Sequence, residues 1–412
     1  MMINRKATIL VALLVLVVAC SHSFAHSQSR FVTTQGKQIV TPDGKPLILK
    51  GIGLGNWLLP EGYMFKFKTA NSPRLINTVV SQLIGEDDAR RFWKIHLDNY
   101  ITRDDIRFIK QSGFNSVRVP FNYRLFVAAD DPQKLEGHGY ELLDRVVGWC
   151  KQEGLYVILD MHGAPGGQTG DNIDDSWGYP FLFESDISQL LTVWIWTKIA
   201  AQFKNEPWVI GYDLLNEPIA HYFDADYLNP KLEPVYRKIV AGIRTVDPNH
   251  IIFLGGAQWN NNFKVFGPPF DSKLVYTFHK YWMDVNQQAI QEYLDFRDKY
   301  NVPLWMGESG ENTDEWVAAY RSILEQNGIG WCFWPYKKID ATSSPVSVNR
   351  PTDWDAIVAF ADHPRATFED VRKSRPTKEK IKTALDGYLE NIKLKNCRIN
   401  QAYLKALGLQ PN

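Results

Sequence analysis

Two glutamates with similar surroundings are the residues of this sequence best suited to chemistry. Glu217 lies near the end of Tyr212–Pro218, and Glu308 directly follows Leu304–Gly307. Each comes after a short apolar run bounded by turn-forming residues, which is typical of a buried strand that ends in a loop. A carboxylate in such a place has no evident packing purpose. Two of them suit the cleavage of a glycosidic bond, which needs an acid and a nucleophile.

The scaffold that would position the two glutamates can be read from the rest of the chain, where short β-branched runs alternate with helical patterns. Eight strands are expected, at Leu47–Gly53, Ser116–Pro120, Tyr156–Met161, Val209–Asn216, Ile251–Gly255, Leu274–Phe278, Leu304–Gly307 and Gly330–Trp334. Helices are expected between them at Arg103–Ser112, Tyr140–Glu153, Ile187–Lys204, Leu232–Val246, Gln287–Tyr300 and Thr313–Asn327. This alternation predicts parallel strands with crossover helices, and eight of them predict a closed (β/α)8 barrel.

The segments outside this alternation are assigned around the barrel. A hairpin over Gln38–Leu49, with its turn at Pro42–Gly44, is expected to close the bottom of the barrel. The first connection after the opening strand is long and should hold extra helices such as Asp87–Asn99. The predicted catalytic domain covers residues 31–375, and a helical tail covers residues 376–412.

The strand ends carry further candidate site residues, because chemistry in such barrels occurs at the C-terminal ends of the strands. Polar or aromatic side chains follow most of the predicted strands. Besides the two glutamates these are Arg118, His162, Asn216, His279, Tyr281 and Trp334. Strands that alternated only for core packing would not end this way so often.

The N-terminus has the pattern of an export signal. Arg5 and Lys6 precede an apolar run over Ala7–Ala19, which is too short to span a bilayer comfortably. Small residues around Ala25 predict a signal peptide over residues 1–25, whereas the lipobox-like sequence before Cys20 predicts a lipoprotein signal over residues 1–19 and a lipid anchor on Cys20. Both alternatives predict an extracytoplasmic protein that is secreted, periplasmic or membrane-anchored.

Composition excludes several other classes. The net charge is zero and the pI is about 7.1, so nothing indicates a nucleic acid partner. Three cysteines, Cys150, Cys332 and Cys397, follow the leader without CxxC spacing, which argues against zinc, and the first two lie in apolar runs and should be buried. No dinucleotide or P-loop motif is present, so we expect neither a cofactor nor a metal.

One further acidic group, Asp171, Asp174 and Asp175, lacks the spacing of an EF-hand, and we expect these residues to be solvated loop acids. The 14 tryptophans suit stacking on sugar rings, although a large core also uses them. The sequence gives no indication of the oligomeric state.

The ordered set of motifs resembles glycoside hydrolase family five. It consists of Asn216-Glu217-Pro218 after one strand, Glu308 after another, Arg118 in Val117–Pro120, and His279-Lys280-Tyr281. The similarity runs from about Gly36 to Trp354, and the loop His162–Gln168 looks closest to the branch that holds exo-acting β-1,3-glucanases.

This resemblance implies a role for each candidate residue. Glu217 falls in the position of the acid/base and Glu308 in that of the nucleophile of a retaining β-glycosidase acting on β-glucan or β-gluco-oligosaccharides. Asn216 would contact the sugar 2-hydroxyl, while Arg118 and Tyr281 would keep Glu308 ionised and oriented. The side chains expected to line the subsite of the cleaved sugar are His162, His279 and, as its floor, Trp334.

Two departures from the exo-glucanase pattern leave linkage and exo or endo action open. One is the insert Thr169–Asp175, and the other is the segment Tyr63–Lys68, which could close one end of a cleft. The alternatives are an endo-β-1,4-glucanase or β-mannanase on the same barrel, or a non-catalytic sugar-binding protein. The presence of both glutamates and Arg118 argues against the last.

Overall fold

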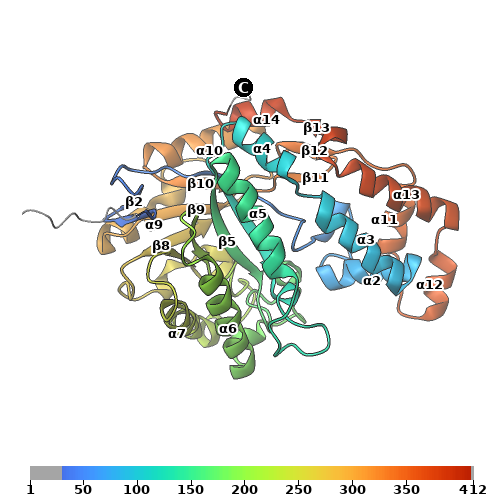
Figure 1. Ribbon diagram of the computed structural model, residues 1–412, viewed down its shortest axis with the longest axis horizontal. Coiled ribbons are helices and arrows are strands. Elements are labelled where there is room, and N and C mark those ends of the chain that lie inside the picture. The colour runs from blue at the N-terminus through green and yellow to red at the C-terminus, as the bar shows by residue number, and fades with distance from the viewer. Residues whose placement is uncertain (1–29, 410–412) are drawn as a thin grey trace, which may run out of the picture. The chain divides into compact units, whose positions relative to one another are not determined.

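A closed barrel of parallel strands forms the centre of the protein. The computed structural model describes residues 30–409, so the predicted export signal and Cys20 lie outside the described residues. Eight strands follow one another in the ring order β10-β3-β4-β5-β6-β7-β8-β9. They are β3 (Lys50–Gly53), β4 (Ser116–Asn122), β5 (Tyr156–Gly163), β6 (Val209–Asp213), β7 (Ile251–Gly255), β8 (Leu274–His279), β9 (Leu304–Glu308) and β10 (Gly330–Phe333). Figure 1 shows barrel strands such as β5, β9 and β10 at the centre, with helices around them. The prediction of a (β/α)8 barrel is confirmed.

Helices cover the outer face of the barrel, which explains why its strands are near-continuous apolar runs. They are α4 (Arg103–Gln111), α5 (Gly139–Glu153), α6 (Asp186–Phe203), α7 (Ala225–Arg244), α9 (Gln288–Tyr300) and α10 (Asp314–Gln326), with a short α8 (Ala257–Asn260) after β7. The expected start of α7 at Leu232 was wrong. The helix starts seven residues earlier, at Ala225, because Asp224 caps it by accepting the backbone N–H of Tyr227. Pro230 and Pro234 are tolerated inside the helix.

The N-terminal hairpin lies earlier than expected. Strands β1 (Thr33–Gln35) and β2 (Gln38–Val40) pair around a turn that contains Gly36 in a left-handed conformation. The expected turn at Pro42–Gly44 also exists, and beyond it a bridge joins Val40 to Pro46 and the Leu47 N–H donates to the Ile39 carbonyl over 2.8 Å. The expected place is confirmed, because Val32 and Ile39 pack in the same cluster as Ile158 and Trp305 of the barrel strands.

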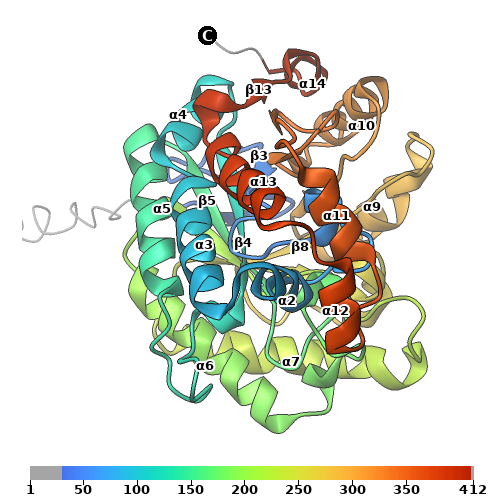
Figure 2. The same cartoon turned by 90° about the vertical axis from the view of Figure 1, so that its right-hand side faces the viewer.

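The long first connection holds a 3-10 turn, η1 (Gly62–Phe65), and two helices, α2 (Pro73–Ile84) and α3 (Glu86–Asn99). The C-terminal part contains α11 (Trp354–Asp362), α12 (Phe368–Ser374), α13 (Lys378–Asn391), η6 (Leu394–Asn396) and α14 (Gln401–Ala406), and a small sheet of β11 (Lys337–Ile339), β12 (Val346–Val348) and β13 (Arg398–Ile399). Helix α13 lies against α3 and α11 (Figure 2). The boundary predicted at residue 376 stays a prediction.

An aromatic cluster joins the C-terminal helices to the first connection. Trp354 stacks on Tyr388 of α13, with ring centroids 5.2 Å apart, and its indole N–H donates to the Phe65 carbonyl over 2.8 Å. On the other side, His96 of α3 contacts the Tyr388 hydroxyl at 3.1 Å and the Asn56 carbonyl at 3.0 Å. These contacts hold the segment between β3 and α2 in place from the side of α3, α11 and α13.

Two further sequence expectations concern single features. Cys150 and Cys332 are buried, as expected, and Cys397 is partly buried. None of the helices within residues 30–409 is long and apolar enough to cross a membrane.

Candidate active site

The C-terminal ends of the strands surround a pocket of about 810 Å³ at one mouth of the barrel. Six of the eight predicted site residues line it: His162, Glu217, His279, Tyr281, Glu308 and Trp334. The other two, Arg118 and Asn216, are fully buried and contact residues that line it. The parallel strands therefore bring all eight candidates to one place.

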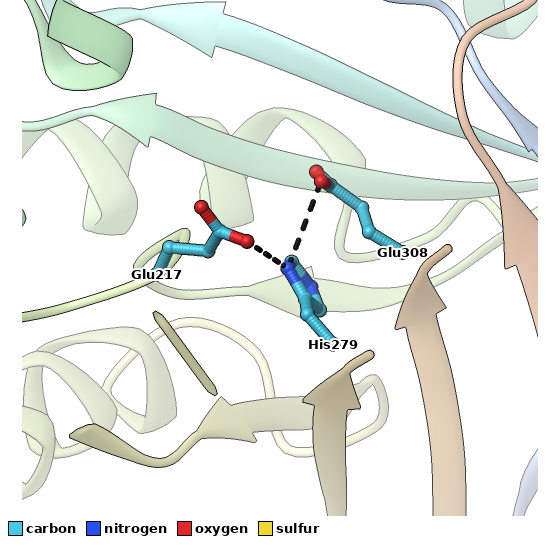
Figure 3. A group of neighbouring side chains, drawn as sticks. All are labelled: Glu217, His279 and Glu308. Carbon is cyan, nitrogen blue, oxygen red and sulfur yellow. Dashed lines mark hydrogen bonds and ion pairs between the residues drawn. The ribbon is translucent and has the colours of Figure 1, made fainter. Parts of the chain in front are cut away.

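The carboxyl groups of Glu217 and Glu308 face each other across His279 (Figure 3). The His279 Nδ1 atom lies 2.8 Å from Oε1 of Glu217 and 3.7 Å from Oε2 of Glu308, and the three donor atoms lie within 4.8 Å of one another. Glycosidases that retain configuration place their two carboxyl groups about 5–5.5 Å apart, whereas inverting enzymes need about 6.5–9.5 Å to admit a water molecule. The close approach of the two carboxyl groups fits the retaining arrangement and leaves too little room for the inverting one.

The backbone around Glu217 departs from the predicted strand, which ends at Asp213 and not at Asn216. Glu217 has φ 45°, a left-handed conformation that is rare for residues with a side chain. It is held by the Thr169 hydroxyl, which donates to the Glu217 carbonyl over 2.8 Å, and by the Gln168 amide, which donates to the Asn216 carbonyl over 2.8 Å. The loop Gln168–Thr169 therefore stabilises the turn that carries Glu217.

Glu308 is held by two donors. The Arg118 guanidinium donates to its Oε1, and the Tyr281 hydroxyl donates to its Oε2 over 3.1 Å. Burial raises the pKa of Glu308, and the Arg118 charge opposes that shift. Hydrogen bonds to both carboxyl oxygens therefore stabilise the ionised form of Glu308.

Arg118 itself stands among carboxylates that the sequence argument missed. Its Nε donates to Asp213 over 2.9 Å, and its Nη2 lies 3.1 Å from Asp160 and donates to Asn216 over 2.8 Å. Burial raises the pKa of Asp160 and of Asp213 to about 7, although the positive charge of Arg118 acts to lower both pKa values. Burial also opposes the charge of Arg118, but these carboxylates hold its pKa well above the ordinary value.

The signal for Asp160 and Asp213 was present in the sequence. Both are acids inside strands that are otherwise apolar, and a fully buried aspartate needs a partner. They fix the Arg118 guanidinium in one orientation, and through it the carboxylate of Glu308.

The two histidines are buried and neutral. His162 donates from Nδ1 to Asp160 over 2.7 Å and stacks on Trp334, with centroids 5.4 Å apart and planes at 7°. Burial lowers the pKa of His162 to about 3 and that of His279 well below its ordinary value. The Asn260 amide lies 3.1 Å from Nε2 of His279 and donates to it, so Nδ1 of His279 carries the proton and donates to Glu217.

Glu217, His279 and Glu308 are also a donor set that a divalent cation accepts. Two features oppose such use. The Nδ1 atom of His279 carries a proton and has no lone pair free, and Arg118 already places a positive charge against Glu308. The geometry fits acid–base chemistry better than metal binding.

Trp334 forms one wall of the pocket, directly after β10. Its indole lies so close to the end of β3 that a Cβ atom on Gly53 would stand 2.4 Å, and one on Gly55 2.5 Å, from ring carbons. The indole N–H donates to the Tyr63 hydroxyl over 2.9 Å. The two glycines therefore make room for this tryptophan.

Glu61 and Tyr63 complete that wall, and the sequence argument did not assign Glu61 at all. Glu61 is 5% exposed, lines the pocket, and its Oε1 has no hydrogen-bond partner among the described residues. Burial and the charge of Glu308 raise its pKa well above the ordinary value. A buried carboxyl oxygen with no protein partner is suited to accept a hydrogen bond from a ligand.

The insert after Gln168 is ordered by its own acids. The Asp174 carboxylate accepts the N–H groups of Thr169, Gly170 and Ser176 over 2.7–2.9 Å. The expectation of solvated loop acids was wrong for Asp174 and Asp175, because both are buried. Asp175 is paired with arginines of α2 and of the loop after β4, and the insert presents Asn172 and Ile173 to the pocket.

Comparison with known proteins is consistent with this geometry. The model of the family Cellulase (glycosyl hydrolase family 5) matches residues 83–339. The chain is 28% identical over 361 residues to a β-xylosidase of Phanerodontia chrysosporium, covering 79% of this chain and 74% of that protein. It is 28% identical over 311 residues to endoglucanase C of Acetivibrio thermocellus, which covers 60% of this chain and 88% of that protein. It is 29% identical over 306 residues to a glucan 1,3-β-glucosidase of Candida oleophila, which covers 68% of this chain and 70% of that protein. Among solved structures, an endogalactoceramidase superposes with a TM-score of 0.60 at 17% identity, covering 92% of this chain and 86% of that one.

Proposed function

Because the chain belongs to glycosyl hydrolase family 5 and is a glycoside hydrolase, we propose that it is a retaining exo-β-glucosidase acting on β-glucans or β-gluco-oligosaccharides, of the β-1,3-glucanase type. In this proposal Glu308 is the nucleophile and Glu217 the acid/base. The observation that carries it is the approach of the two carboxyl groups, of which one oxygen each lies within 4.8 Å of the other.

The proposed reaction is a double displacement. The ionised Glu308 attacks the anomeric carbon while Glu217 protonates the departing oxygen, which gives a glycosyl ester on Glu308. Glu217 then takes a proton from water as the water oxygen attacks the same carbon and Glu308 leaves as a carboxylate. Burial and the charge of Glu308 raise the pKa of Glu217 well above its ordinary value, so it holds the proton that the first step needs.

The exo assignment is supported by Glu61, Tyr63 and Trp334, which line one side of the pocket where they could bound a terminal sugar. Asn216 would lie under the 2-hydroxyl, since the buried amide is already oriented by Arg118 and His162. The relatives named as a glucan 1,3-β-glucosidase and a β-xylosidase support removal of single sugars, whereas the relative named as an endoglucanase supports internal cleavage.

Product analysis tests the proposal against its alternatives. Laminarin, carboxymethyl-cellulose, mannan and mixed-linkage glucan are incubated separately, and NMR follows the anomeric configuration in the first minutes. Glucose alone from laminarin, released in the β-configuration, is expected. Mixed oligosaccharides from carboxymethyl-cellulose or mannan would instead identify an endo-β-1,4-glucanase or a β-mannanase. Binding without hydrolysis of any polymer would identify a non-catalytic sugar-binding protein.

The pH profile should be a bell whose alkaline limb belongs to Glu217. As the pH rises through the elevated pKa of Glu217, the proton for the leaving group is lost and kcat/KM falls. As the pH falls through the pKa of Glu308, the nucleophile becomes protonated and kcat/KM falls again. A substrate with an activated aryl leaving group needs no protonation, so it should lose the alkaline limb and keep the acid limb. An alkaline limb that is identical for both substrates would remove Glu217 from the acid role.

Replacing Glu61 by alanine removes its carboxyl oxygen from the pocket and should lower kcat/KM for a terminal glucoside about 2- to 10-fold, the usual contribution of a hydrogen bond between uncharged groups, because the raised pKa of Glu61 keeps its carboxyl group protonated. Its Oε1 has no protein partner and its backbone N–H keeps its bond to Asn56, so thermal stability should be unchanged. Kinetics and thermal denaturation of the variant are measured together. A loss of stability with unchanged kinetics would make Glu61 a structural residue.

We also propose that the protein works outside the cytoplasm, because Arg5 and Lys6 precede an apolar run with two possible processing sites. The mass of the protein recovered from its native host tests this. A chain starting at His26 is expected for a cleaved signal peptide, and an acylated Cys20 for a lipoprotein. An unprocessed N-terminus would contradict both.

A further inference from the structure

The side of the pocket opposite Glu61 and Tyr63 has a different character. In the ring of eight strands β7 is the fourth neighbour of β3 in either direction, so the loop after β7 faces the loop after β3 across the mouth. The loops after β7 and β8 bring Trp259 and Trp282 to the pocket, with His221 from the loop that carries Glu217. A group leaving past Glu217 would meet these aromatic side chains.

Both tryptophans are held in backbone conformations that residues with side chains rarely adopt. Trp259 has φ 62° and Trp282 has φ 56°, and the neighbours Gln258 and Asn260 are also left-handed. Such conformations are unfavourable for residues with side chains and persist only where the surroundings impose them. Packing does not explain Trp282, because it is 72% exposed. Strained backbone around an exposed aromatic ring indicates a use for that ring.

Each indole is also fixed by its own N–H group. Trp259 donates to Nδ1 of His221 over 2.9 Å, and Trp282 donates to the carbonyl of Glu311 over 3.3 Å. The strained turn below Trp259 is tied to the loop of Glu217, because the Gln258 N–H donates to the Ile219 carbonyl over 2.9 Å. The polar edges of the two rings are therefore used within the protein, and what remains for a ligand is their faces.

The polar side chains on this side are already engaged. Lys280 lies 3.7 Å from the carboxylate of Glu292 and pairs with it. The amide N–H groups of Asn261 donate to the carbonyls of Gln258 and Trp259. The sugar side, by contrast, presents the unpartnered carboxyl oxygen of Glu61. A leaving group would find ring faces here but few free hydrogen-bonding groups.

We propose that Trp259 and Trp282 form a stacking subsite for the leaving group, and that the subsite selects planar aromatic alcohols. Substrates would then include β-glycosides of aromatic aglycones, and aromatic alcohols would act as acceptors. This inference rests on the proposed retaining glucosidase function. In the transfer step the acceptor oxygen bonds to the anomeric carbon, its proton passes to Glu217, and the ester bond to Glu308 breaks with release of the carboxylate.

Acceptor selection tests the subsite independently of the leaving group. β-Glucosyl fluoride serves as donor, because its leaving group has no ring, and 2-phenylethanol and 2-cyclohexylethanol compete as acceptors with similar hydroxyl chemistry and apolar area. The phenyl glucoside should exceed the cyclohexyl glucoside roughly three- to tenfold, as expected for aromatic stacking. Trp282→Leu should bring this ratio close to one, and Trp282→Phe should retain most of it.

Trp194→Leu is the matched control, since Trp194 of α6 is also exposed but does not line the pocket, and it should keep the wild-type ratio. A wild-type ratio near one, an unchanged ratio in both Trp282→Leu and Trp259→Leu, or preferred transfer to glucose would overturn the inference and leave the proposed function intact. Absence of fluoride release would overturn the proposed function as well, so the two failures are distinguishable.

Discussion

Replacing Glu308 by glutamine should lower kcat by about 10⁴-fold or more, the usual scale for loss of a nucleophile that acts together with its partners. Glutamine has nearly the same shape, so its carbonyl oxygen can still accept from Arg118 or Tyr281. The Arg118 charge keeps Asp160 and Asp213 beside it. Since burial raises the pKa of Glu308, the ionised form is costly in the folded protein, and the melting temperature of the variant should be equal or higher.

The matched control for this variant is Glu311→Gln. Glu311 also lines the pocket, but its carboxylate pairs with Lys338 and lies outside the group formed by Glu217, His279 and Glu308. Its turnover should fall less than about tenfold, the scale of one partly exposed ion pair. Near wild-type turnover in Glu308→Gln, measured on protein with a normal melting curve, would sink the nucleophile assignment.

Replacing Glu217 by alanine should produce a different defect, one that depends on the leaving group. Loss of a general acid costs about 10²- to 10⁴-fold for a natural glycoside, whereas an activated aryl glycoside should form the glycosyl ester at close to the normal rate. Hydrolysis of that ester then becomes slow, because no base assists water. Azide needs no base, so it should restore turnover and give a β-glycosyl azide of retained configuration.

Glu217→Gln is the control for the space that azide needs. Glutamine removes the proton transfer but fills the volume of the side chain and can still accept from His279, so azide should rescue it much less. The rates with and without azide, together with NMR of the azide product, decide the assignment. An α-azide, or no rescue of the alanine variant with any leaving group, would move the acid role to another residue.

The barrel could be predicted because each of its strands is marked by a local sequence pattern. A buried parallel strand is a short apolar run between turn-forming residues, and seven of the eight strands start at the expected residue. The strand expected at Leu47 starts at Lys50 instead, and Leu49 before it packs in the cluster that fills the barrel bottom. Once eight parallel strands were assigned, the placing of Glu217 and Glu308 at one mouth followed from topology.

Residues brought in by long connections were harder to predict. Glu61 and Tyr63 lie between β3 and α2, where no periodic pattern leads to the pocket, and α2 itself was not assigned. Trp259 and Trp282 follow strands directly, but their left-handed backbones depend on hydrogen bonds to distant loops, which spacing cannot reveal. Asp174 looked like a solvated acid because its three donors are backbone N–H groups, which leave no mark in the sequence.

The aromatic cluster around Tyr388 supports the residues near Glu61 but not the two reacting carboxyl groups. Substrate specificity can therefore evolve separately from the reaction itself. Glu308 ends the barrel strand β9 and Glu217 follows β6, whereas the Glu61 N–H donates to Asn56, whose carbonyl contacts His96, and His96 in turn contacts Tyr388 of α13. Sequence drift in the last helices can therefore shift the sugar end of the pocket without touching the reacting groups. Related proteins can therefore change substrate specificity through substitutions in the C-terminal helices. Exchanging these helices between relatives offers the same route to protein engineering.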